Sequence, residues 1–329
     1  MYYRELGNTQ IEVSVIGMGC WALAGDWVWG AQEEAESLAT VRAALDAGVT
    51  LFDTAEGYGD GYSEEVLGRA LNGRRREAVI ATKVSRSNLS ADQIPRSCGA
   101  SLRRLQTDYI DLYQIHWPNW DIPIEETFGA LEKLRQQGKV RAIGVCNFGV
   151  RDLSDLLAVG HCAANQLPYS LLWRAIEFEV QPKCAAEDVG ILCYSPLAQG
   201  LLTGKFRTRD DVPEGRARTR HYSSQRPLAR HGEDGCEEET FAAIEDIRRI
   251  CQDAHLSMGE VALAWLLAQQ GVTSVLAGAR HPDQVRENAR GADLALPSEI
   301  VSRLTSATDS LKRKLGPNID PYQPRGRVR

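Results

Sequence analysis

Ile110-Asp111-Leu112-Tyr113-Gln114-Ile115-His116 is a short, apolar and β-rich run of the kind that forms a buried strand. An amphipathic helical pattern follows at Ile124–Gln137, and Gly138 stands just past its end, where a left-handed residue is favoured. The next β-rich run comes at Ala142–Val145. This succession of strand, helix and strand predicts a β/α unit with parallel strands.

The same unit recurs along the chain. The predicted strands are Val15–Met18, Leu51–Phe52, Val79–Ala81, Ile110–Ile115, Ala142–Val145, Asn165–Leu167, Ile191–Tyr194 and Ser274–Leu276. The predicted helices are Glu33–Ala47, Ser63–Leu71, Ala91–Leu105, Ile124–Gln137, Val150–Ala158, Phe178–Glu187, Glu238–Ala254, Met258–Gln269 and Pro282–Arg290. Eight strands that alternate with helices favour a closed (β/α)8 TIM barrel of the α/β class over a doubly wound sheet, and the length suits a single domain over residues 1–329.

Two segments do not fit the repeating unit. Arg4–Leu6 and Ile11–Val13 flank Gly7-Asn8-Thr9, which predicts an N-terminal β-hairpin. The long polar segment Thr203–Cys236 follows the seventh strand and carries seven arginines. It is either a solvated mobile loop or a lid over bound phosphates. The tail after Leu315 is rich in proline and arginine, so we expect it to be irregular.

Composition narrows the function classes. A net charge of −6 without a basic block argues against a nucleic-acid partner. The eight cysteines include no C-x-x-C pair and no adjacent histidine cluster, so we expect free thiols and no metal site. No apolar run approaches the roughly 20 residues that span a bilayer, and the charged N-terminus is unlike a signal peptide. We therefore expect a cytoplasmic protein without a membrane partner; the oligomeric state stays open.

Two glycine motifs resemble nucleotide-binding loops. Gly17–Ala22 fits the dinucleotide pattern G-x-G-x-x-A after a strand, but no helix begins before Glu33, so the helix N-terminus that a Rossmann site needs is missing. Gly200–Phe206 resembles a P-loop, but Gln199 and Phe206 replace two required residues. A loop that binds phosphate through its backbone stays open for this second stretch.

Four ionisable residues follow consecutive strands. Asp53 ends the second strand, Tyr58 comes five residues later, Lys83 ends the third strand and His116 ends the fourth. Each residue alone has an ordinary structural role, but the carboxyl ends of barrel strands meet at one mouth, where active sites form. A lysine ammonium near a tyrosine lowers the tyrosine pKa toward the range that suits proton transfer. Asp53 would hold Lys83, and His116 would orient a carbonyl oxygen.

Beyond these four residues, the sequence resembles the aldo-keto reductase family over nearly its whole length, closest in style to the bacterial, plant and channel β-subunit-like branches. The motifs that carry the resemblance are Phe52–Gly59, Ser63-Glu64-Glu65, Leu67-Gly68, Ala81-Thr82-Lys83, Asp111–His116, Ile143–Phe148, Asn165-Gln166, Tyr194–Leu197, Gly200–Phe206 and Gly278-Ala279-Arg280 with Gln284 and Asn288.

The resemblance implies that Asp53, Tyr58, Lys83 and His116 form a catalytic tetrad, and that the cofactor is NADPH/NADP+, with NADH as the alternative. It places the nicotinamide against Tyr194, with its carboxamide near Asn147 and Gln166. The implied cofactor-binding set is Gly19, Cys20, Trp21, Asp53, Cys146, Asn147, Gln166, Tyr194, Ser195, Pro196, Leu197, Gly200, Leu201, Lys205, Gly278, Arg280, Gln284 and Asn288. Cys146 departs from the serine that is usual in the family, and a thiol is a weaker hydrogen-bond donor.

Arg280 is the residue expected to select NADPH. It follows the last strand and precedes a helix that begins at Pro282, so a 2′-phosphate there would meet both a guanidinium and a helix N-terminus. Its alternative role is a surface salt bridge. The acidic Asp283 would repel a phosphate if it turned inward, and we expect it to face solvent.

Tryptophans gather in loops at the same mouth. They serve either as rim packing or as walls of an apolar substrate pocket. The predicted pocket is Trp21, Trp27, Trp29, Tyr58, His116 and Trp117.

The predicted function is NADPH-dependent reduction of an aldehyde or ketone to an alcohol, with a small carbonyl compound or sugar as substrate. Two alternatives stay open: an NAD(P)-dependent sugar or alcohol dehydrogenase that works in the oxidative direction, and a regulatory barrel resembling a channel β-subunit. A metal-dependent hydrolase is excluded, because His116 is the only histidine at the predicted strand ends.

Overall fold

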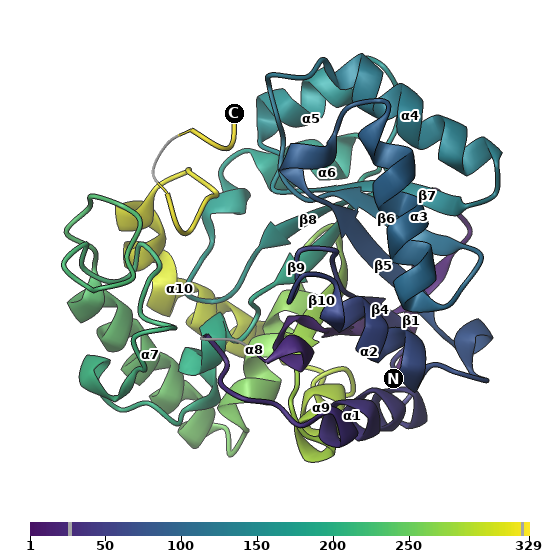
Figure 1. The fold of residues 1–329 in the computed structure, drawn as a ribbon. Helices are drawn as coiled ribbons and strands as arrows, with labels where there is room; N and C mark the ends of the chain where they lie inside the picture. Colours follow the sequence, from purple (N-terminus) through teal and green to yellow (C-terminus); the bar gives the residue numbers. More distant parts are fainter. Residues whose placement is uncertain (26–27, 324–325) are drawn as a thin grey trace.

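A computed structural model of the chain describes residues 1–25, 28–323 and 326–329 (Figure 1). In this part of the chain, eight parallel strands close into a barrel in the order β10-β3-β4-β5-β6-β7-β8-β9, which confirms the predicted fold. The barrel strands are β3 (Ile16–Gly19), β4 (Leu51–Asp53), β5 (Val79–Val84), β6 (Ile110–Ile115), β7 (Val140–Cys146), β8 (Ala164–Pro168), β9 (Gly190–Tyr194) and β10 (Val272–Gly278).

Helices surround the barrel, and most begin and end within a few residues of the predicted bounds. They are α1 (Glu34–Asp46), α2 (Tyr62–Ala70), α3 (Gln93–Leu105), α4 (Ile124–Gln136), α5 (Val150–Leu157), α6 (Val180–Ala186), α7 (Glu237–Asp253), α8 (Met258–Leu267), α9 (Pro282–Arg290) and α10 (Ser298–Leu315). The sequence analysis missed α10, which packs against α7 and buries Leu304, Thr308, Leu311 and Leu315. Its apolar stripe includes a threonine, which weakens the helical pattern in the sequence. None of the described helices is both long enough and apolar enough to cross a membrane.

The N-terminal hairpin closes the lower end of the barrel. Strands β1 (Tyr3–Glu5) and β2 (Glu12–Ser14) pair antiparallel, within one residue of the predicted strands. Leu6, Ile11 and Val13 are buried against an apolar layer inside the barrel. That layer consists of Leu51, Ala81, Leu112, Ala142, Ala163, Ala164, Leu192 and Leu276. Side chains therefore fill the barrel interior at the end that the hairpin covers, and a ligand enters from the carboxyl ends of the strands.

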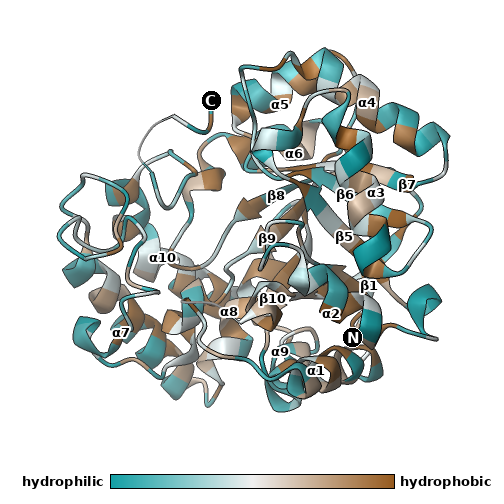
Figure 2. Cartoon of the chain, in the orientation of Figure 1, coloured by the Kyte–Doolittle hydropathy of each residue, from teal (hydrophilic) through white to brown (hydrophobic). Residues whose placement is uncertain are grey.

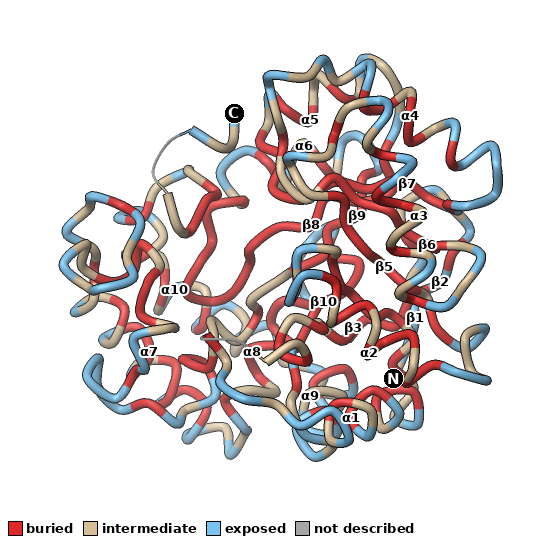
Figure 3. The backbone as a smooth tube through the Cα atoms, in the orientation of Figure 1, coloured by how far each residue is buried: buried red, intermediate tan, exposed pale blue. Residues whose placement is uncertain are grey.

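Burial follows the layers of the fold. The strands are buried along most of their length, whereas the outer helices alternate between buried and exposed residues (Figure 3). The same helices carry mixed hydropathy, with apolar residues on the side that faces the barrel (Figure 2). All eight cysteines are buried and none forms a disulfide, as expected.

Two further segments rise above the mouth of the barrel. Residues 203–236 are irregular apart from short helical turns, and they lie between β9 and α7. Residues 316–323 follow the end of α10, and residues 326–329 reach the start of α5, where the chain end lies in Figure 1. There the carbonyl of Arg329 accepts hydrogen bonds from the backbone N–H groups of Arg151 (3.0 Å) and Asp152 (3.2 Å).

The contact between α2 and α3 depends on a glycine. A Cβ at Gly68 would lie 2.7 Å from the carbonyl oxygen of Arg104 and 2.7 Å from the carbonyl carbon of Leu105. We predict that Gly68→Ala lowers the free energy of unfolding by about 1–3 kcal/mol, because the two helices must move apart. Gly129 in α4 is the matched control, since nothing lies within 4 Å of its Cβ position.

Gly129→Ala should instead stabilise the protein by about 0.5–1 kcal/mol through helix propensity. Denaturant unfolding of both variants beside the unchanged protein measures the two effects. Equal shifts in the midpoints of Gly68→Ala and Gly129→Ala would show that close helix contact is not what requires a glycine at Gly68.

Candidate active site

A polar layer lies directly above the apolar layer of the barrel. Side chains two residues apart on a strand point to the same side, so each interior apolar residue is followed two positions later by another interior residue. Leu51 is followed by Asp53, Ala81 by Lys83, Leu112 by Gln114, and Ala164 by Gln166. Four strands, β4, β5, β6 and β8, thus bring polar groups together at the mouth.

Lys83 is at the centre of this layer and its side chain is fully buried. Its ammonium nitrogen lies 2.6 Å from Asp53 Oδ1, 2.8 Å from the carbonyl oxygen of Thr54 and 3.2 Å from Tyr58 Oη. An ammonium has three N–H donors, and these three acceptors use all of them. The Tyr58 oxygen therefore accepts a hydrogen bond from Lys83, and its own O–H is left to point elsewhere.

Tyr58 keeps its proton in this environment. Burial raises the pKa of Tyr58 to about 12, although the charge of Lys83 acts to lower it. The expectation that Lys83 would bring the tyrosine pKa below its ordinary value is thus wrong for the protein alone, because the loss of hydration outweighs the attraction to one cation. The residue is a phenol, able to donate a proton, throughout the physiological pH range.

His116 faces the same point from the end of β6. Its ring meets the Tyr58 ring edge-on, with 5.8 Å between the ring centroids. Burial lowers the pKa of His116 to about 3, and the positive charges of Lys83 and Arg327 act in the same direction. The imidazole is therefore neutral and carries one N–H, which suits it to donate a hydrogen bond to an oxygen.

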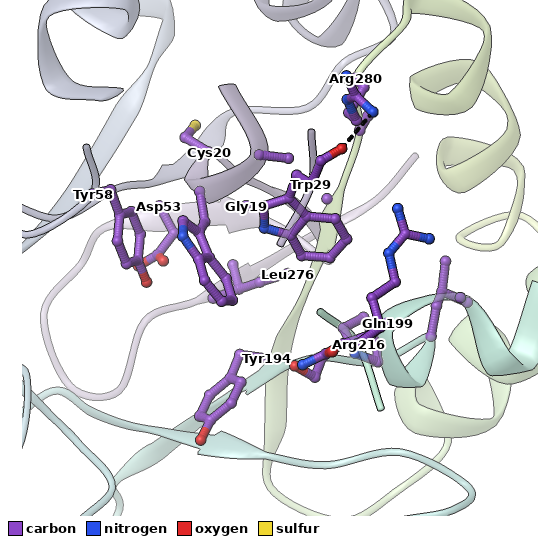
Figure 4. A pocket seen from close by; sticks show the side chains of 18 of the residues that line it. Gly19, Cys20, Trp29, Asp53, Tyr58, Tyr194, Gln199, Arg216, Leu276 and Arg280 are labelled. Atoms are coloured by element: carbon purple, nitrogen blue, oxygen red, sulfur yellow. Dashed lines mark hydrogen bonds between the residues drawn. The ribbon is translucent and has the colours of Figure 1, made fainter. Parts of the chain in front are cut away.

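A cavity of about 600 Å³ opens above these residues and extends across the barrel to α9. In Figure 4, Tyr58 and Asp53 lie at one end, and Arg216 and Arg280 lie at the other. The predicted site residues that line it are Gly19, Cys20, Trp21, Trp29, Asp53, Tyr58, His116, Trp117, Asn147, Gln166, Tyr194, Ser195, Pro196, Leu197, Gly200, Lys205, Gly278, Arg280, Gln284 and Asn288. Most of the residues predicted from their positions at strand ends and most of the cofactor-binding residues implied by the resemblance thus line the same cavity.

Three predicted residues lie outside the cavity wall. Lys83 is beneath Asp53 and Tyr58, and it acts on the cavity through them. Cys146 and Leu201 are buried, and Cys146 Sγ lies 3.5 Å from Gln114 Oε1. Contact of Cys146 or Leu201 with a cofactor therefore has no support in this geometry. Trp27, the remaining predicted pocket residue, is outside the described part of the chain.

The sequence reading missed part of the wall. Arg216, Arg218 and Arg230 reach the cavity from the loop after β9, and the seven arginines of that loop were the available signal. Tyr322 and Arg327 reach it from the C-terminal segment, where no sequence pattern indicated a role. The other missed residues are Ala22, Gln199, Thr203, Leu276, Ala279 and Glu287.

The C-terminal segment is tied down at the mouth by its own contacts. Arg327 donates two hydrogen bonds to Asp320, at 2.8 and 2.7 Å, and its guanidinium lies 3.8 Å from the centre of the Trp117 ring. Tyr322 accepts a hydrogen bond from Gln199 at 3.1 Å. These contacts make the segment a wall of the cavity beside His116.

Positive charge gathers at the opposite end of the cavity. Burial and the charge of Arg216 lower the pKa of Lys205, and burial and the charge of Arg280 lower the pKa of Arg216. Among the described residues, Arg216 Nε and Gln199 Oε1 are buried without a hydrogen-bond partner. Three cations that repel one another beside unsatisfied polar atoms form a cradle suited to the phosphates of a dinucleotide.

Arg280 already has partners in this cradle. It donates to Gln32 Oε1 (2.7 Å), to the carbonyl of Trp29 (2.8 Å; Figure 4) and to the carbonyl of Ala31. A guanidinium has five N–H groups, so two remain for another acceptor. Arg280 therefore clamps the loop before α1 while it faces the cavity. Asp283 is exposed and paired with Arg286, as expected.

Comparisons with known proteins agree with the resemblance. A model of the "Aldo/keto reductase family" matches residues 15–309. The chain is 36% identical to aldo-keto reductase YhdN of Bacillus subtilis over 91% of each chain. It is 33% identical to the NADH-specific methylglyoxal reductase of Escherichia coli, over 94% of this chain and 98% of that one. An aldo-keto reductase from Klebsiella pneumoniae, solved in complex with NADPH, superposes with a TM-score of 0.74 at 30% identity over 96% of both chains. The chain therefore belongs to the aldo/keto reductase family.

Proposed function

We propose that this protein reduces an aldehyde or ketone to an alcohol, with NADPH as the hydride donor and Tyr58 as the proton donor. The observation that carries the proposal is the hydrogen bonding of Lys83, whose three N–H groups are all used and one of which meets Tyr58 Oη. This bond leaves the phenolic O–H directed away from Lys83, toward the cavity that Tyr58 lines.

The residues of the site act on the carbonyl oxygen. Tyr58 and neutral His116 each donate a hydrogen bond to it, which polarises the carbon–oxygen bond. A nicotinamide held against Tyr194 would supply the hydride for the carbonyl carbon. The oxygen then takes the proton of Tyr58, and the alcohol is complete. Lys83 stabilises the tyrosinate that remains, and Asp53 keeps Lys83 charged and in place.

The cavity fits a nicotinamide dinucleotide along its length. Tyr194 offers a ring face for the nicotinamide, and Asn147 and Gln166 offer amide groups for its carboxamide. Lys205, Arg216 and Arg280 supply positive charge at the far end, where the phosphates would lie. Arg216, whose guanidinium lies 5.2 Å from the centre of the Trp29 ring, would make the long loop a lid over the cofactor. NADH stays the alternative cofactor, because the similar methylglyoxal reductase of Escherichia coli is named NADH-specific.

Aromatic side chains would hold the organic part of the substrate. Trp21 is stacked on Tyr58 at 5.9 Å and meets Trp29 edge-on at 5.5 Å. Trp117, which directly follows His116 in the chain, lines the same cavity. These faces suit an apolar or sugar-like substrate.

Simple measurements distinguish the proposed function from its two alternatives. An oxidative dehydrogenase would use ionised Tyr58 as the base, whereas the reductase uses protonated Tyr58 as the acid, so the pH profiles of the two directions differ. A regulatory barrel of the channel-subunit kind needs no turnover. Steady-state assay of simple aldehydes with NADPH tests the proposal, and absence of turnover on a broad panel would reject it.

Replacement of Tyr58 by phenylalanine removes the proton donor and little else. We predict that Tyr58→Phe lowers kcat by about 10²–10⁴-fold and leaves the Kd for NADPH unchanged. Tyr62→Phe is the control, because the Tyr62 hydroxyl bonds to Glu34 at the surface, 2.8 Å away. Both constants follow from steady-state kinetics and fluorescence titration. Retention of more than about a tenth of kcat in Tyr58→Phe would assign the proton donor elsewhere.

The pKa values of the site predict opposite pH profiles for the two directions. Reduction needs protonated Tyr58 and neutral His116, with pKa values of about 12 and about 3, so its kcat/KM should be flat from about pH 5 to pH 9. Alcohol oxidation needs ionised Tyr58, so its kcat/KM should rise about tenfold per pH unit over that range. A reductive profile with an acidic limb near pH 6.5 would mean that His116 titrates as an ordinary histidine.

Arg280 is predicted to select the coenzyme with its two remaining N–H groups. Arg280→Ala should raise the Kd for NADPH about tenfold to a hundredfold and leave the Kd for NADH unchanged. Arg286→Ala, on the exposed face of α9, is the control that should change neither. If Arg280→Ala weakened both coenzymes equally, its role would be limited to holding the Trp29 loop.

A further inference from the structure

Gln114 is a buried polar residue to which the proposed mechanism gives no role. It follows Leu112 on the interior side of β6, its side chain is fully buried, and it does not line the cavity. Its Nε2 lies 3.2 Å from Asp53 Oδ2. Its Oε1 lies 3.4 Å from Gln166 Nε2 and 3.5 Å from Cys146 Sγ. The Gln114 amide therefore connects Asp53 with Gln166 and Cys146, on β4, β8 and β7.

The orientation of both glutamine amides follows from Asp53. Asp53 Oδ2 lies 2.7 Å from Gln166 Nε2 as well as 3.2 Å from Gln114 Nε2. An ionised carboxylate only accepts hydrogen bonds, so each glutamine must turn its NH₂ group toward it. Gln114 consequently presents its carbonyl oxygen to Gln166.

This arrangement uses both N–H bonds of Gln166. One points to Asp53 Oδ2 and the other to Gln114 Oε1, so the Gln166 carbonyl oxygen must point away from both. Within the described residues, Gln166 Oε1 accepts no hydrogen bond, and Gln166 lines the cavity. A single bond to Asp53 would let the amide swing about that bond, whereas two bonds fix its plane.

We propose that Gln114 is a positioning residue: it fixes the Gln166 amide so that the Gln166 carbonyl oxygen faces the cofactor and accepts an N–H of the nicotinamide carboxamide. The inference rests on the proposed function, since it needs a nicotinamide cofactor in this cavity. It adds a second function for the network around Asp53, because the carboxylate that holds Lys83 also sets the direction of the cofactor-binding amide.

The neighbouring strand leaves room for this side chain. A Cβ at Gly144 on β7 would lie 3.0 Å from Gln114 Cγ and 3.0 Å from Leu112 Cδ1. A larger residue at Gly144 would press on the glutamine stem. The absence of a side chain at Gly144 thus leaves space for both Gln114 and Leu112. A buried amide is costly unless its groups are bonded, and here both ends of the Gln114 amide have partners.

The test compares three ligands that share the adenosine half of the cofactor. NADP+ carries the carboxamide, its 3-acetylpyridine analogue replaces the NH₂ of the carboxamide with a methyl group, and 2′,5′-ADP lacks the nicotinamide. The wild type should bind NADP+ about threefold to tenfold more tightly than the analogue, as one neutral hydrogen bond allows. Dissociation constants come from quenching of tryptophan fluorescence, so turnover is not needed.

Gln114→Met keeps the length of the side chain and removes its three hydrogen bonds, to Asp53, Gln166 and Cys146. This variant should lose the preference for NADP+ over the analogue, so that the ratio of the two Kd values falls to about one, while the Kd for 2′,5′-ADP stays unchanged. Gln166→Met should do the same, and the double variant should add nothing further. Such a result would not follow from a general loosening of the barrel, which would weaken all three ligands.

Gln114→Glu supplies a second readout if the methionine variant does not fold. When protonated, the new carboxyl group can donate to Asp53 and accept from Gln166, as the amide does. When ionised, it repels Asp53. Burial and the charge of Asp53 should raise the pKa of the new group, so the preference for NADP+ should be close to that of the wild type at pH 6 and be lost at pH 9.

Three outcomes would overturn the inference: an unchanged NADP+ preference in Gln114→Met, equal weakening of all three ligands, or a lost preference in Gln114→Glu at both pH values. Failure of the proposed function looks different, because the wild type itself would then bind neither NADP+ nor 2′,5′-ADP.

Discussion

The ammonium group of Lys83 is held out of water at the centre of the barrel, and the chemistry of the mouth depends on how its charge is compensated. Asp53 supplies the opposite charge at 2.6 Å, and the Thr54 carbonyl and Tyr58 oxygen take the remaining N–H groups. Removal of two ions from water is costly, so such a pair is tolerable only when its remaining lone pairs and protons are bonded. Gln114 and Gln166 meet that need on the far side of Asp53. One buried charge thus orients four side chains, Asp53 and Tyr58 directly and Gln114 and Gln166 through Asp53.

The pattern of apolar and polar residues along the sequence was sufficient to predict the repeated strands and helices of the barrel and the residues at the strand ends. Asp53, Lys83 and His116 could be placed together because parallel strands of a barrel end at the same face. Tyr58 was found by its position five residues after Asp53. The pKa of Tyr58 was not predictable in the same way. Burial is the largest influence on this pKa, and it depends on residues that are distant in sequence.

The parts that sequence reasoning missed are those fixed by contacts between distant segments. Helix α10 has a stripe interrupted by Thr308, and its burial against α7 is what stabilises it. Tyr322 and Arg327 belong to an irregular tail, and Asp320, Gln199 and Trp117 determine their place at the cavity. The sequence gives no role to Gln114, because the function of an interior glutamine depends on its neighbours, which here lie on β4, β7 and β8.

The C-terminal segment has a consequence for the order in which the protein is built. Residues 320–323 and 326–329 leave the ribosome after every strand of the barrel, yet they form part of the wall beside His116 and bond to the start of α5. The barrel, the Lys83–Asp53 pair and the residues around the phosphate end of the cavity all precede them in the chain. The wall of the cavity beside His116 is therefore complete only after residues 320–323 and 326–329 have been made, whereas the strand ends that carry Asp53, Lys83 and Gln166 are made much earlier.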